Sequence, residues 1–235
     1  RSVRIMVRWQ AVEPYENPTE EARARLTGEN REAIERMRRR GIVIAPPVQD
    51  LDTNGFYWEK YDERFEAAQR SGLDVLFTLR ATSLWGTVQK ARLGTKGGYV
   101  VASRPKDMQR WKDFVAAFVS RYKGRGVRVF YEVENEVNAK AFWTGSPEDY
   151  VALLKETYQT IKASDPSARV LHAAMACGMT KDARGPVRAK GLERHDGFLR
   201  RIFDSRAFDI ISTHDYYFPD QAVNGFTFGS YLDHI

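Results

Sequence analysis

The sequence contains a single cysteine, Cys177, among 235 residues. One cysteine excludes an intrachain disulfide framework as the basis of the fold and says little about the cellular compartment. No apolar run reaches the roughly 20 residues that span a bilayer, so we expect no membrane span. The chain opens with Arg1-Ser2-Val3-Arg4 rather than with a signal peptide. Because its first residue is not methionine, secretion and a cytoplasmic location both stay open.

The signatures of nucleotide and metal sites are missing as well. No Gly-x-Gly-x-x-Gly follows the first apolar run, and the glycines at 94–98 are too irregular for a phosphate loop. Residues 50–55 match the first half of a calcium loop, but the twelfth position is Tyr61, where a bidentate glutamate is needed. The four histidines show no metal-ligand spacing. The sequence therefore implies neither a metal nor an organic cofactor.

The charge is strongly positive, with a formal net value of +6 and a pI near 9.4. Much of the excess lies in runs such as residues 36–40. Cations in the last turn of a helix are stabilised by the helix dipole, and a solvated helix end is the favoured interpretation. A nucleic-acid surface and an anionic sugar substrate are the alternatives. We expect no nucleic-acid partner.

Apolar runs alternate with amphipathic segments along the whole chain. The runs are rich in β-branched and aliphatic residues, as in buried parallel strands. The segments between them have helical spacing, and two end at Gly41 and Gly72, as a helix C-cap would. The predicted strands are 3–9, 42–48, 74–79, 127–133, 169–175 and 208–213, and the predicted helices include 33–37, 65–68, 111–118, 151–161 and 199–203. Repeated alternation of this kind predicts an α/β fold with a parallel sheet.

Between an open sheet and a closed barrel, the chemistry of the candidate site favours the barrel. We therefore predict a (β/α)8 TIM barrel, which takes about 250 residues, as a single catalytic domain over 1–235. Six β/α units do not close such a barrel, so about two more are expected beyond residue 235. The connection at 82–107 is long, and long loops over the carboxyl face of a barrel are usually functional.

Three carboxylates occupy alternate positions in the middle of the chain. The apolar run at 127–133 contains Glu132 near its end and is followed by Glu134 and Glu136. Because side chains alternate along an extended strand, we expect the three on one face and Asn135 on the other. Crowded carboxylates need cationic partners or raise the pKa of one member, and a carboxylic acid that stays protonated near neutral pH suits general-acid catalysis.

The places of the carboxylates along the predicted strand indicate different roles for them. For Glu132 the favoured interpretation is a structural ion pair with an inward arginine such as Arg8 or Arg80. Glu136 follows the carboxyl end of the strand, where the catalytic groups of a barrel project. It is therefore the candidate proton donor.

The surrounding residues resemble a known family. Residues 131–138 read YEVENEVN, residues 142–150 read FWTGSPEDY, and Asp165 and Pro166 follow the next helix. This series resembles the fourth-strand region of clan A glycoside hydrolases and is most similar to family 39 and its relatives. The family reads roughly Trp-Glu-Val-Trp-Asn-Glu-Pro-Asn there, so Glu134 replaces an aromatic residue and Val137 a proline.

Other parts of the chain extend the resemblance in the same order, from about Gly55 onward. They are YWEKYD at 57–62, TSLW at 82–85 and FDIISTHDY at 208–216. These resemble the family's Tyr-Asp-Trp-x-x-x-Asp helix start, its Thr-Pro-x-Trp after the third strand, and the Asp-x-Ile-Ser-x-His-x-Tyr of its sixth strand.

The resemblance implies a retaining glycosidase acting on an oligo- or polysaccharide. Glu136 matches the general acid/base, and Asn135 matches the residue that hydrogen-bonds the sugar 2-hydroxyl. His214 and Tyr216 match residues that face the active site. The nucleophile of such enzymes is a carboxylate after the seventh strand, and we expect it beyond residue 235.

Alternatives stay open for individual residues and for the whole chain. Trp85 and Trp143 are candidate platforms for a sugar ring, although either can simply fill the loop layer. His214, without the resemblance, is equally well explained as a packed core histidine. A barrel of this fold that binds carbohydrate without catalysis is the alternative function, because Glu134 and Val137 differ from the family pattern.

Overall fold

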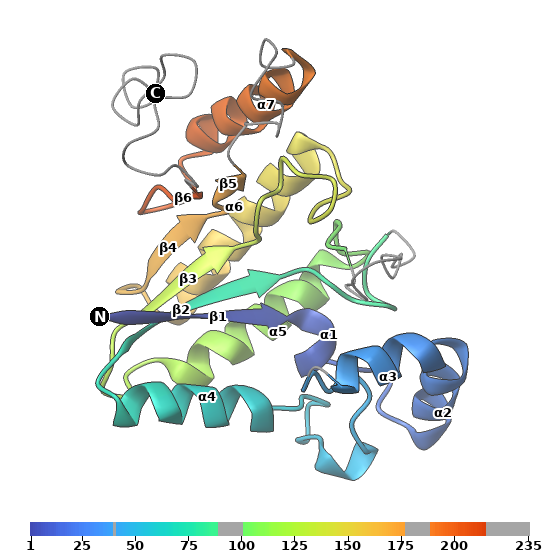
Figure 1. Ribbon diagram of the computed structural model, residues 1–235. Helices are drawn as coiled ribbons and strands as arrows, with labels where there is room; N and C mark the ends of the chain where they lie inside the picture. Colours follow the sequence, from blue (N-terminus) through green and yellow to red (C-terminus); the bar gives the residue numbers. More distant parts are fainter. Residues whose placement is uncertain (40, 89–100, 177–188, 215–235) are drawn as a thin grey trace.

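The computed structural model describes residues 1–39, 41–88, 101–176 and 189–214. Four strands, β1 (Ser2–Arg8), β2 (Asp74–Arg80), β3 (Val129–Val133) and β4 (Arg169–His172), form one parallel sheet in that order (Figure 1). A second parallel pair joins β5 (Met175–Ala176) to β6 (Thr213–His214). A parallel bridge between Leu171 and Ile210 places the segment before β6 beside β4. The predicted α/β architecture with parallel strands is confirmed.

Helices connect the strands in the manner of β/α units. Figure 1 shows α4 (Glu59–Arg70), α5 (Met108–Tyr122), α6 (Pro147–Ser164) and α7 (Ala189–Ser205) following the strands in chain order. Each lies close to the helical segment that the sequence predicts. The remaining helical elements belong to the connection after β1: α1 (Trp9–Val12), α2 (Glu20–Glu29), α3 (Arg31–Arg39) and the 3-10 turn η1 (Val48–Asp50).

Local sequence fixes where the two central helices begin. The Asp107 side chain accepts from the amide of Gln109 at the start of α5. At the start of α6, Ser146 and Asp149 each accept from the other's backbone amide, and Pro147 occupies the first turn. Such caps satisfy amide groups that have no partner inside the helix.

An aromatic layer between the sheet and α5 forms much of the core. Phe77 of β2 packs against Phe118 and Tyr122 of α5, with ring centroids 4.9 Å apart in both pairs. All three side chains are fully buried. They belong to a single core cluster that extends from β1 to α7.

The strand predicted at 42–48 is wrong. Residues 42–47 lie outside any helix or strand, and β1 pairs directly with β2, Ser2 opposite Asp74 and Arg8 opposite Arg80. Pro46 and Pro47 have no N–H to donate to a ladder, which opposes pairing despite the apolar residues before them. Among the described strands, Glu136 therefore follows the third rather than the fourth.

Two other predicted strands are shorter than expected. The run at 169–175 is split into β4 and β5, and the run at 208–213 contributes only β6 and the bridge at Ile210. Among the residues whose structure is described, no helix combines the length and apolar character needed to cross a membrane.

Candidate active site

The chain makes an unusual turn directly after β3. Glu134 and Glu136 have φ angles of 71° and 45°, in the left-handed region that side-chain-bearing residues rarely adopt. Backbone bonds hold both residues: the Glu134 amide donates to the carbonyl of Leu79 at 2.9 Å, and the Glu136 amide donates to that of Ala174 at 2.8 Å. Conformations of this kind cost about 1–3 kcal/mol each and cluster at functional sites.

Glu132 is the structural carboxylate of this region. It is 1% exposed, and its Oε2 accepts from Arg4 Nη2 at 2.5 Å and from Thr78 Oγ1 at 2.7 Å. Its Oε1 accepts from Ser212 Oγ at 2.9 Å. An ion pair with an inward arginine was expected, but the partner is Arg4 rather than Arg8 or Arg80.

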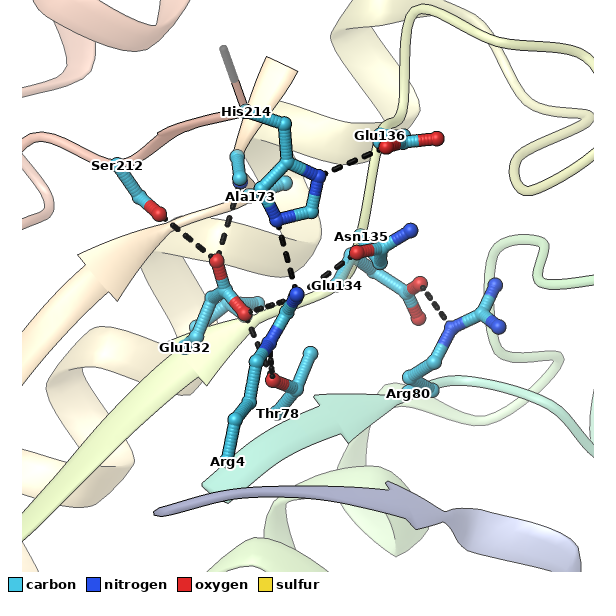
Figure 2. Close-up of polar contacts among 12 residues, drawn as sticks. Arg4, Thr78, Arg80, Glu132, Glu134, Asn135, Glu136, Ala173, Ser212 and His214 are labelled. Atoms are coloured by element: carbon cyan, nitrogen blue, oxygen red, sulfur yellow. Dashed lines mark hydrogen bonds and ion pairs between the residues drawn. The ribbon is translucent and has the colours of Figure 1, made fainter. Parts of the chain in front are cut away.

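Arg4 connects the residues around Glu132 (Figure 2). Its Nη2 also donates to Asn135 Oδ1 at 2.8 Å, and its Nη1 lies 2.8 Å from His214 Nε2. Asn135 therefore lies on the same side as Glu132, and the expectation that it points to the opposite face is wrong. Strand alternation ends at β3, and the left-handed Glu134 turns the next side chain back toward Arg4.

Glu136 lies beside His214, as Figure 2 shows. Its Oε1 is 2.7 Å from His214 Nδ1, and its side chain is 10% exposed. Arginine has donors only, so Arg4 donates to the lone pair of His214 Nε2. The neutral ring then carries its proton on Nδ1 and donates it to the Glu136 carboxylate. One arginine thereby sets both the tautomer of His214 and the orientation of its bond to Glu136.

Glu134 is the third carboxylate and is fully buried. Its Oε2 lies 3.3 Å from Arg80 Nε, and its Oε1 accepts from the amide of Ala81. Burial raises the pKa of the Glu134 carboxyl, and the charge of Arg80 opposes that shift. Arg80 Nη2 also donates to the carbonyl of Phe142 at 3.0 Å, so the pair ties the end of β2 to the chain after Glu136.

The two tryptophan candidates differ in the structure. Trp143 is fully buried, packs against Tyr150 and donates from Nε1 to the Ser146 carbonyl at 3.2 Å. Its predicted role as a sugar platform is wrong, because no face of the ring is open. Trp85 is partly exposed, with the Arg110 guanidinium 4.5 Å from its ring centroid. Tyr216 lies outside the described residues.

Sequence reasoning missed Arg4, Thr78 and Ser212. Arg4 carries a detectable signal, because it is one of only two charged residues, with Arg8, in the apolar strand run at 3–9. Thr78 and Ser212 have no such signal, since hydroxyl residues are common in strands and loops. Within the described ranges, no three histidine, cysteine, aspartate or glutamate side chains are grouped so as to hold a metal ion.

Comparison with solved structures relates this geometry to known folds. A monomeric beta-xylosidase from Caulobacter crescentus CB15 matches with a TM-score of 0.53 and 23% identity, over 92% of this chain and 42% of that one. The chain shares the fold of the glycoside-hydrolase TIM barrels. A GH39 beta-xylosidase from Caulobacter crescentus matches with a TM-score of 0.53 and 20% identity, over 91% of this chain and 46% of that one. A GH39 enzyme from Xanthomonas axonopodis pv. citri matches with a TM-score of 0.51 and 19% identity, over 91% and 40% of the two chains.

Sequence comparison adds a shorter match. A beta-xylosidase from Geobacillus stearothermophilus is 35% identical over 80 residues, which are 32% of this chain and 16% of that protein. No profile of a known protein family matches the sequence. The chain thus spans less than half the length of each of these relatives.

The barrel fold relates the positions of Glu136, Asn135 and His214 to the place where TIM barrels have their active sites. The predicted (β/α)8-barrel class is confirmed, and the chain covers part of such a barrel. In glycoside-hydrolase barrels, as in other TIM barrels, the active site lies at the carboxyl ends of the strands. Glu136 and Asn135 follow β3, and His214 ends β6. All three lie at that edge of the sheet (Figure 2).

Proposed function

We propose that the full-length protein is a retaining glycoside hydrolase in which Glu136 is the general acid/base. The observation that carries the proposal is the Glu136 carboxylate at the carboxyl end of a barrel strand, nearly buried and 2.7 Å from His214 Nδ1. A carboxyl group shielded from water and oriented by a hydrogen bond suits transfer of a proton to and from a bound sugar.

The reaction then proceeds in two displacements. In the first, Glu136 gives its proton to the glycosidic oxygen while a second carboxylate attacks the anomeric carbon, so the leaving group departs as an alcohol. In the second, Glu136 removes a proton from water, whose oxygen attacks the same carbon and releases the carboxylate. The second carboxylate is expected beyond residue 235, about 5 Å from Glu136 in the assembled site.

Neighbouring residues have supporting roles in this mechanism. The Nδ1–H of His214 stabilises the Glu136 carboxylate after it has lost its proton, and it keeps that carboxylate in one orientation. Asn135 has its Oδ1 occupied by Arg4, which leaves its amide N–H groups to donate to a sugar hydroxyl. Tyr216 is proposed to face the same site, although it lies outside the described residues.

The substrate is proposed to be an oligo- or polysaccharide, with β-xylosides as the first compounds to test. Two of the structures and the sequence relative described above are named as beta-xylosidases. We expect aryl β-xylosides to be cleaved with release of the β-sugar as the first product, which proton NMR of the fresh reaction detects.

The Glu136→Gln variant of the full-length protein tests the proposal. We expect kcat on 4-nitrophenyl glycosides to fall at least about 100-fold, because glutamine cannot donate the proton. The first step should be much less impaired on 2,4-dinitrophenyl glycosides, whose leaving group needs no protonation. Glu148→Gln, at an exposed carboxylate of α6, is the matched control and should leave both rates unchanged. Equal rates for the parent and Glu136→Gln would show that the assignment is wrong.

A carbohydrate-binding protein without catalysis is the second candidate. The buried Arg80–Glu134 pair favours this second candidate, because Glu134 occupies a position where the family 39 glycoside hydrolases that the sequence resembles have an aromatic residue. Under this alternative the full-length protein binds oligosaccharides and shows no hydrolysis, and Glu136→Gln changes neither property.

A further inference from the structure

A groove lies beyond the carboxyl ends of β1 and β2, at the loops that follow these two strands. Its floor is aromatic and apolar, formed by Tyr15, Trp85 and the α2 residue Leu26. The rim carries polar side chains that are exposed to solvent: Asn17, Arg25 and Glu29. An apolar floor with a polar rim is typical of small-ligand sites, in which a few polar groups fix the orientation of the ligand.

Trp85 is held in place before any ligand arrives. The Arg110 guanidinium lies over its ring, and Trp9 makes a T-shaped contact with it, with ring centroids 5.2 Å apart. Trp85 Nε1 donates to the Glu13 carbonyl at 3.2 Å. Arg110 is fixed in turn, with its Nε 2.6 Å from Glu13 Oε1 and its Nη2 2.5 Å from the Glu16 carbonyl. A ring fixed in this way loses little conformational freedom on binding.

The two loops that line the groove are joined by a buried glutamine. Gln10 Nε2 donates to the Pro14 carbonyl at 2.6 Å, and Gln10 Oε1 accepts from the Leu84 amide at 2.7 Å. Pro14 and Leu84 both line the groove. The floor is therefore one preformed surface built from the ends of both strands.

Helix α2 closes the groove without contributing to the core. None of its residues is buried, yet Ala22 and Leu26 are half-buried where they line the groove. Figure 1 shows α2 and α3 beyond the carboxyl end of β1, apart from the helices that follow the sheet. Helix α2 therefore forms one side of the groove and adds no residue to the hydrophobic core cluster.

We propose that this groove binds a neutral pyranose unit of an oligosaccharide whose other end lies at Glu136. The ring would stack its C–H face on Trp85, and its hydroxyls would meet the polar rim. Because the charged residues that line the groove are one cation, Arg25, and two acids, Glu16 and Glu29, it does not select an anionic sugar. The groove follows β1 and β2 and Glu136 follows β3, so both lie at the carboxyl edge of the sheet, and the proposed sugar chain would extend along that edge. The proposal rests on the proposed function and makes it specific for oligosaccharides over monosaccharide glycosides.

Calorimetric titration of the full-length protein tests the groove directly. Glu136→Gln serves as the parent so that bound sugar is not cleaved, and the probes are xylobiose, xylohexaose and cellohexaose. Two variants change the groove from opposite sides: Trp85→Ala removes the platform, and Ala22→Trp fills the space from α2. Val88→Ala, at an exposed apolar residue after the same strand as Trp85, is the matched control.

We expect both groove variants to raise the Kd of whichever hexaose the parent binds by about tenfold, as loss of an aromatic anchor does. The Kd of xylobiose should change less than about twofold, and the control should match the parent. The proposal is overturned if hexaose binding is unchanged in both groove variants, if both sugar lengths lose affinity equally, or if the parent binds no hexaose. Failure of the proposed function is read separately, from equal aryl glycoside rates of the wild-type and Glu136→Gln proteins.

Discussion

At the scale of single residues, the site depends on charged side chains that are buried in pairs. Glu132 is paired with Arg4, and Glu134 with Arg80. A buried charge is tolerated when its partner and its hydrogen bonds are in place, and loss of one partner leaves the other uncompensated. These pairs hold two residues that come shortly before Asn135, so their integrity affects where Asn135 and Glu136 point.

The Arg80–Glu134 pair is expected to be strongly coupled. Arg80→Met and Glu134→Met should each lower the free energy of unfolding by about 3–5 kcal/mol, because each leaves a buried charge without its partner. The double variant should lose clearly less than the sum of the two, which urea unfolding of all four proteins measures. Additive losses would show that the two charges do not interact.

At the scale of elements, His172 links β4 to the segment that leads into β6. The ring is fully buried, with Nδ1 2.8 Å from the Ala173 carbonyl and Nε2 accepting from the Ser212 amide at 3.3 Å. Phe208 contacts it at right angles, with centroids 5.0 Å apart. Because Ser212 precedes His214 by two residues, this contact positions the strand that carries His214 to Glu136.

Acidification should weaken this link. Burial lowers the pKa of His172, so the folded protein binds fewer protons at this site than the unfolded chain does. The stability is therefore fully present above the unfolded pKa of about 6.5 and is lost as the pH falls through the lowered folded pKa. The free energy of unfolding should fall more steeply between pH 7 and pH 5 in the wild type than in His172→Gln. The other histidines are shared by both proteins, and equal slopes would contradict the prediction.

At the scale of the whole molecule, one core cluster extends from β1 to α7. Phe118 of α5 lies within it, in contact with Phe77 of β2 and with Trp58 and Tyr61 at the start of α4. A core that is continuous across the elements predicts that they unfold together rather than one by one.

Phe118→Ala should lower the free energy of unfolding by about 3–5 kcal/mol, because it opens a cavity in this aromatic layer. Circular dichroism in the far ultraviolet and tryptophan fluorescence should report the same shifted transition. Val151→Ala, at a half-buried α6 residue, is the milder control. Separate transitions for the two signals would show that the core is not one cooperative unit.

Sequence reasoning succeeded where the signal is local. The helices α5 and α6 are marked by apolar spacing, and the structure shows that Asp107 and Ser146 cap them. The run at 42–48 has equally apolar residues, but Pro46 and Pro47 prevent it from joining the ladder, and apolar composition alone did not reveal this. Trp143 shows the same limit, because the local sequence does not indicate whether its ring is buried or exposed.

The sequence by itself predicted an α/β fold with parallel strands and placed Asn135 and Glu136 directly after a strand, because both depend on short-range patterns. Only the tertiary structure decided which charges meet. Arg4 reaches Glu132 across 128 positions and His214 across 210, and the left-handed backbone at Glu134 turns Asn135 toward Arg4. Contacts of that range and that backbone conformation depend on packing of the whole sheet, which no local pattern of residues encodes.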